Sequence, residues 1–179
     1  MADYRDLRFR ELAIVLAADL DAALAELLYN RLIGDDNELI ELLGANEDGR
    51  AVGGSFGARI QLARAVGILR VNEAQTLRIL KKIRNLVAHR VKISYSSQQI
   101  QMSMEQLHAN LMTFSFDDGA TIAEYIIKKW TGKKSHAKVT NLAFGRRVLI
   151  GSALTLQLAF LDMLGTIKRI EIVETANKI

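Results

Sequence analysis

Apolar residues along the chain recur mostly at three- and four-residue spacing, which is the spacing of an amphipathic helix. The first such stripe lies between Asp3 and Ile33 and consists of Leu7, Ala13, Ile14, Ala17, Leu20, Leu24, Leu27 and Leu28. A second stripe predicts a helix from Glu73 to about Arg90 with Asn72 as its N-cap, and its apolar face is Leu77, Leu80, Ile83 and Val87. The pattern therefore predicts a helical protein.

Shorter helices are expected around these two. Glu38–Leu43 follows the stop and cap in residues 34–37. A helix at Ala58–Ala65 or a little beyond follows a glycine-rich loop, with Ser55 as its N-cap, and Gly67 ends or bends it. Val91–Tyr95 alternates between apolar and polar residues and could be extended, and a helix is expected from Ser96 or Ser97 to about Met112. A turn at Phe114–Gly119 and a helix at Thr121–Trp130 follow. The rest is expected to be a basic loop at Gly132–His136 and helix, in two pieces, from Lys138 to about Thr175.

The segment Val148–Gly165 is nearly long enough to cross a bilayer. Gln157 and Asp162 lie inside it, and an aspartate in the middle of a membrane helix costs about 2.5–3.5 kcal/mol on insertion scales. We therefore expect a central helix buried by its neighbours, and no membrane partner.

Composition changes this picture little. The 179 residues include no proline, which suits long helices, and the length suits one domain, so we expect a single-domain all-α bundle of about six to eight helices over residues 1–179. The absence of cysteine excludes disulfides and cysteine-ligated metals and fits a cytoplasmic protein. The net charge of +4 permits contact with nucleic acid without requiring it.

The common cofactor and metal motifs are not met. Gly53–Gly57 lacks the spacing and the preceding strand of a dinucleotide-binding loop, and Gly132–Ser135 lacks the spacing of a P-loop. Lys133 and Lys134 belong to a basic patch that contacts nucleic acid or a partner, or is simply solvated. The three histidines, His89, His108 and His136, lack metal-ligand spacing, so neither a metal nor another cofactor is expected.

The string Arg84-Asn85-Leu86-Val87-Ala88-His89 carries the most chemistry. Within a helix Asn85 and His89 stand one turn apart on one face, and Arg84 lies beside them. Arginine can hold a phosphate with paired hydrogen bonds, and histidine can transfer protons near neutral pH. The structural alternative is that Arg84 and His89 only stabilise the helix, because cations near a helix C-terminus interact favourably with the helix dipole, and that Asn85 and His89 only hold the helix against a neighbouring one. Lys81, Lys82 and Arg90 make the surroundings basic and are candidate contacts for RNA or an acidic partner.

The stretch 55–89 resembles the mannitol operon repressor family. That family has a similar S-F-x-A-[RK]-I-x-L-A-x-x-x-G-[IL] helix followed by a helix that ends in R-N-x-[FL]-A-H. The matching residues here are Ser55, Phe56, Ala58, Arg59, Ile60, Leu62, Ala63, Gly67, Ile68, Ile83, Arg84, Asn85, Ala88 and His89. The resemblance covers roughly residues 1–110, is specific in its central third, and implies a transcriptional regulator that lacks its own DNA-binding motif and acts through a regulatory protein partner. We expect it to form a homodimer.

The same string is similar to that of the HEPN superfamily, a group of helical proteins that includes metal-independent ribonucleases with an R-x4–6-H motif at a dimer interface. This resemblance implies catalytic roles for Arg84 and His89, with Asn85 as the polar residue beside the arginine. A ribonuclease should expose Arg84 and His89 in a cleft. A regulator should bury them or engage them in hydrogen bonds within the chain.

Overall fold

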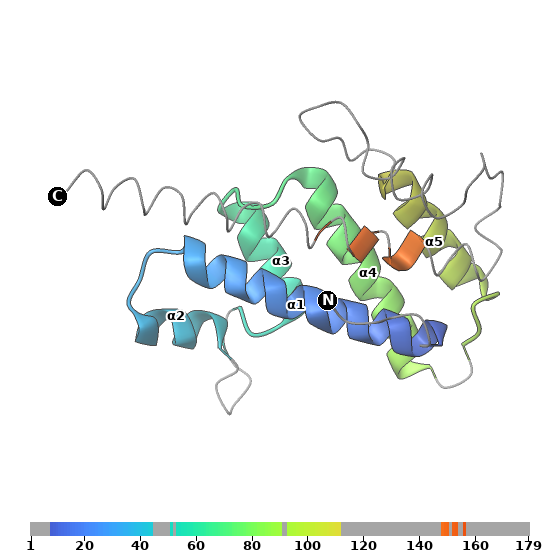
Figure 1. Cartoon of the computed structure of the whole chain (residues 1–179), viewed down its shortest axis with the longest axis horizontal. Helices are drawn as coiled ribbons and strands as arrows, with labels where there is room; N and C mark the ends of the chain where they lie inside the picture. The colour runs from blue at the N-terminus through green and yellow to red at the C-terminus, as the bar shows by residue number, and fades with distance from the viewer. Residues whose placement is uncertain are drawn as a thin grey trace.

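The computed structural model describes residues 8–44, 51, 53–90, 93–111, 148–150, 152–153 and 156. The helices are α1 (Phe9–Arg31), α2 (Asp36–Leu43), α3 (Phe56–Ala65), α4 (Val71–His89) and α5 (Gln98–Leu111), and the described residues of 148–156 are helical as well (Figure 1). This confirms the prediction of an all-α bundle.

Helix α1 forms the longest wall of the core. Its predicted stripe is confirmed for Ala13, Ala17, Leu20, Leu24, Leu27 and Leu28, and Leu12 and Leu16 are buried as well. The extra leucines are buried because α1 contacts three helices, α2, α3 and α4, so more than one side of it is covered. The helix begins at Phe9, after the extended Arg8, and not at the predicted Asp3. It ends at Arg31, before the predicted Ile33.

Helix α4 lies at the centre of the bundle, in contact with α1, α3 and α5 (Figure 1). The four residues of its predicted apolar face are all buried in the core cluster, which confirms that face: Leu77, Leu80, Ile83 and Val87. Helix α5 closes the other side of α4 with Ile100, Met104 and Leu107.

The helix starts are set by carboxylates and hydroxyls that accept hydrogen bonds from free backbone amides. The Asp35 side chain accepts from Glu38 N at 2.9 Å, and Ser55 Oγ accepts from Ala58 N at 3.2 Å, which confirms Ser55 as a cap. The prediction of Asn72 as the cap of α4 was wrong.

Helix α4 begins at Val71, two residues earlier than predicted. Arg70 is its N-cap, and the buried Glu73 carboxylate accepts from Arg70 N at 2.6 Å. Glu73 thus occupies the third helical position, where a carboxylate closes a capping box, and Asn72 lies inside the first turn. The helix ends at His89, and Arg90 has extended backbone.

The other predicted segments are confirmed only in part. Helix α5 begins at Gln98, close to the predicted start at Ser96 or Ser97. Ile93 and Ser94 lie in no regular element and Tyr95 begins a turn, so the described part of 91–95 is not a strand. The predicted turn at 114–119, helix at 121–130 and basic loop at 132–136 lie outside the described residues, as does most of 138–175.

The apolar segment near the carboxyl end contributes to the core where it is described. Val148, Leu149, Ala153 and Leu156 are buried in the same cluster as α1 and α4, as expected of a central helix. Gln157 and Asp162 lie outside the described residues. Among the helices of the described part, none has the length and apolar character needed to cross a membrane.

Gly67 terminates α3 with a left-handed backbone, at φ +79°. This conformation lets Gly67 N donate to Arg64 O at 3.3 Å and Ile68 N donate to Ala63 O at 2.9 Å, so the last carbonyls of the helix are satisfied. A Cβ at this position would have no atom within 4 Å. Only the backbone angle therefore requires glycine here.

We predict that Gly67→Ala lowers the free energy of unfolding by about 1–2 kcal/mol, the cost of holding an L-residue in the left-handed region. Gly67→Asn should lose less, because asparagine tolerates this region better. Urea denaturation of the three proteins measures the difference. An alanine variant as stable as the wild type would contradict this account of the turn.

Candidate functional site

The face of α4 opposite its apolar stripe carries basic and amide side chains. Arg78, Lys82, Asn85 and His89 follow one another at spacings of four and three residues, so they share one face of the helix. Arg78, Lys82 and His89 are exposed, and Asn85 is partly buried. The burial of Leu80, Ile83 and Val87 directs this face outward.

No carboxylate of α4 offsets these cations. The single acidic residue of the helix is Glu73, which is 4% exposed and accepts the hydrogen bond from Arg70 N. The outward face of α4 is therefore positively charged along its length, which attracts anionic groups.

The three predicted catalytic residues are brought together only in part. Arg84 is exposed, and its Nη1 donates to Asn85 Oδ1 at 3.0 Å. His89 is exposed on the last turn of α4, on the same face as Asn85. Among the contacts of the described residues, no hydrogen bond links His89 to Asn85, so the structural alternative of an Asn–His pair is not observed there. The structure thus holds the Arg84 guanidinium beside Asn85 and leaves the His89 imidazole at the surface.

The other candidate contacts differ in their roles. Lys82 is exposed and Lys81 is partly buried. Arg90 Nη1 donates to Gln99 Oε1 at 2.6 Å, which connects the end of α4 to α5. Lys133 and Lys134 lie outside the described residues.

A pocket of about 360 Å³ opens between α3 and α4. The described residues that line it are Gly57 and Gln61 from α3 and Arg78, Lys81, Lys82 and Asn85 from α4. Sequence reasoning missed Arg78, although its spacing from Lys82 places both on one helix face. No sequence pattern indicates that Gln61 and Gly57 belong to this pocket, because their position there depends on how α3 packs against α4.

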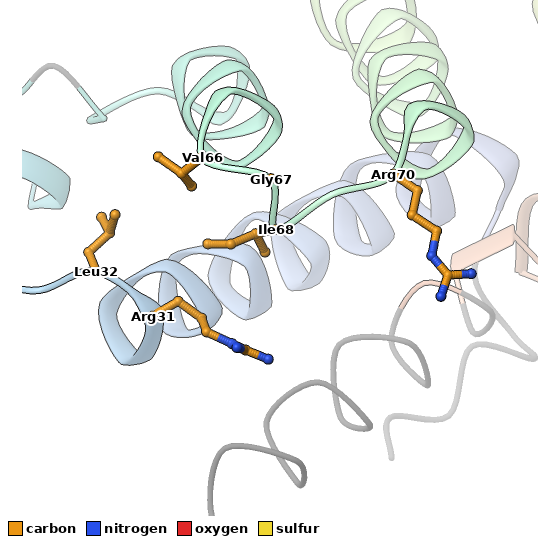
Figure 2. Close-up of a pocket in the computed structure, with 6 residues that line it drawn as sticks. All are labelled: Arg31, Leu32, Val66, Gly67, Ile68 and Arg70. Atoms are coloured by element: carbon orange, nitrogen blue, oxygen red, sulfur yellow. The ribbon is translucent and has the colours of Figure 1, made fainter. Parts of the chain in front are cut away.

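A second pocket, of about 400 Å³, lies where the end of α1 meets the segment that joins α3 to α4 (Figure 2). Arg31 and Arg70 approach it from different helices, and Leu32, Val66 and Ile68 supply apolar surface (Figure 2). None of the predicted site residues lines this pocket.

Many of the residues that carry the family resemblance have a structural role. Arg59 joins three helices, because its Nη1 donates to Asp21 Oδ1 at 2.7 Å and its Nη2 donates to Leu43 O at 2.9 Å. Ser55 caps α3, Gly67 ends it, and Ile60, Ala63 and Ile83 are buried in the core. Arg84 and His89 are exposed, and unlike these residues they neither cap or end α3 nor lie in the core cluster.

The histidines do not form a metal site within the described part of the chain, where no cluster of three or more histidines and carboxylates could hold an ion. His89 is on α4 and His108 is on α5, and His136 lies outside the described residues. The chemistry open to the α4 face is thus the binding of anions by Arg and Lys, and proton transfer by His89.

No family model matches the chain, and no curated protein or solved structure is significantly similar to it. The likeness to the mannitol operon repressor family therefore depends on the residues quoted from the sequence.

Burial on α5 lowers the pKa of His108 below its ordinary value. The unfolded chain then binds a proton near pH 6.5 that the folded chain takes up only at lower pH. The stability that neutral His108 contributes is fully present above about pH 6.5, the pKa of the unfolded chain. It is lost as the pH falls from there through the lower pKa of the folded chain. We predict that unfolding free energy declines less between about pH 7.5 and about pH 5.5 in His108→Gln than in the wild type. Urea denaturation at both pH values measures this, and equal declines would contradict it.

Proposed function

We propose that this chain is a transcriptional regulator similar to the mannitol operon repressor family, which acts by binding a partner protein. The observation that supports the proposal most directly is that Arg84 is engaged in a hydrogen bond within the chain, to Asn85, and that neither Arg84 nor His89 lines the α3–α4 pocket. These residues belong to the family-like string, yet they make no contribution to the core. An exposed residue with no packing role is more readily explained by binding than by folding.

The chemistry of the face indicates the kind of partner. A surface with several cations and no exposed carboxylate favours an acidic protein surface, and charge complementarity speeds the encounter and sets its orientation. The hydrogen bond from Arg84 to Asn85 limits the rotation of the guanidinium, so less conformational entropy is lost on binding. We further propose that the regulator acts as a homodimer.

A genetic complementation experiment tests the regulator. Deleting the gene should change the transcript level of a limited set of operons, and wild-type protein should restore it. Arg84→Glu should fail to restore it, because it reverses the charge of the exposed side chain that is hydrogen-bonded to Asn85 at the edge of the basic face. Arg70→Glu, the same charge change at the other end of α4, should restore it. An unchanged transcript profile after deletion, or full rescue by Arg84→Glu, would contradict the proposal.

A specific observation favours a second candidate, an HEPN-type metal-independent ribonuclease. Arg84 and His89 are both exposed, as expected for catalytic residues and not for the buried residues of a regulator. The 2′-hydroxyl of the RNA would lose its proton to His89 as it attacks the adjacent phosphorus, and Arg84 would stabilise the charged phosphorane. His89 would then return the proton to the departing 5′-oxygen, which leaves a 2′,3′-cyclic phosphate. Against this candidate, neither residue is among those that line the α3–α4 pocket.

Incubation of the purified protein with RNA in EDTA separates the two candidates. For a ribonuclease we expect cleavage that persists in EDTA and falls by about 10²–10⁴-fold in His89→Ala, the usual contribution of a general acid or base. His89 is exposed, so circular dichroism should show that the variant folds normally. No cleavage by either protein would eliminate the ribonuclease, whereas cleavage lost in the variant would overturn a function limited to binding.

A further inference from the structure

The pocket between α3 and α4 gathers three cationic side chains around a small volume. Arg78, Lys81 and Lys82 line it together with the amides of Gln61 and Asn85. Its volume of about 360 Å³ lies within the range of about 300–1,000 Å³ that is usual for small-molecule sites. None of the described residues that line it is acidic.

The three cations have no carboxylate partner within the described part of the chain. Arg78 lies three and four residues before Lys81 and Lys82, and like charges at these spacings destabilise a helix. The ion pair of Arg59 with Asp21 shows how a neighbouring arginine is neutralised by the fold. The pocket cations lack such a partner, so a bound anion would relieve their repulsion.

Gly57 gives the Lys81 ammonium its position. A Cβ on Gly57 would overlap Lys81 Nζ, so a larger residue would push the ammonium out of its place at the pocket wall. Gly57 has an ordinary helical backbone and lies in the first turn of α3, so a substitution there would act by displacing the flexible Lys81 side chain and not through the backbone angle. The first turn of a helix adds further positive potential to that already supplied by the cations.

We propose that this pocket binds the phosphoryl group of a small organic phosphate. Arg78 can hold two phosphate oxygens at once, and Lys81 and Lys82 supply point charges from the same helix. The amides of Gln61 and Asn85 can donate to and accept from the uncharged polar part of the ligand. The small volume of the pocket favours a small ligand over the extended backbone of a nucleic acid. The site shares Arg78, Lys82 and Asn85 with the basic face of α4, but its ligand is a small phosphate and not a protein, and Arg84 and His89 are outside it.

Isothermal titration of the full chain with inorganic pyrophosphate at constant ionic strength tests the site. We expect saturable binding of one pyrophosphate per chain. Lys82→Gln should weaken it about tenfold, the loss of one charge-assisted hydrogen bond. The matched control is Arg70→Gln, which makes the same charge change at the N-cap of α4, outside this pocket, and should bind as the wild type does.

Gly57→Ala distinguishes loss of the site from loss of the fold. Alanine is the better helix former, so the melting temperature should not fall, whereas pyrophosphate binding should weaken as Lys81 is displaced. The absence of pyrophosphate binding to the wild type would overturn the proposal, and so would equal weakening by Arg70→Gln and Lys82→Gln. Titration with a short single-stranded RNA completes the test, because a protein that bound the RNA and not pyrophosphate would have a nucleic-acid surface here instead.

Discussion

The packing of α4 against α1 is the constraint on which the rest of the structure depends. Leu77, Leu80, Ile83 and Val87 are buried between α4 and its neighbours, and burying four such side chains contributes roughly 6–12 kcal/mol before the entropy of ordering them is subtracted. That amount is comparable to the whole net stability of a small domain, about 5–15 kcal/mol. A shift of one residue would turn the helix by about 100° and bring Arg84 toward the core. The core therefore determines which side chains of α4 face outward.

The parts of this arrangement that depend on local sequence could be predicted. The apolar stripe of α4, the Ser55 cap and the turn at Gly67 each follow from the residues of one segment, and the structure confirms all three. The first turn of α4 was misassigned because Asn72 is a good cap residue, and the choice of Arg70 depends on the buried Glu73 carboxylate. The pocket could not be predicted, because Gly57 and Lys81 meet only through the packing of α3 against α4.

The residues that carry the family resemblance divide into two groups once their surroundings are known. Arg59 is engaged with α1 and α2, and Ile60 and Ile83 fill the core, so their presence is explained by the fold. Arg84 and His89 are exposed, and the core does not explain them. A string that combines both groups identifies a fold more securely than an activity, because most of its residues would be required whatever the protein does.

The α3–α4 pocket and the basic face of α4 share Arg78, Lys82 and Asn85, and Asn85 also accepts the hydrogen bond from Arg84. An anion in the pocket would reduce the positive potential of the whole face, and it would accept from the Asn85 Nδ2 group while Asn85 Oδ1 accepts from Arg84. Such an anion would therefore weaken the attraction of the face for an acidic partner. By linkage, the partner would weaken the binding of the anion by the same factor. The close spacing of the two surfaces on α4 thus couples ligand binding to partner binding without requiring a change of fold.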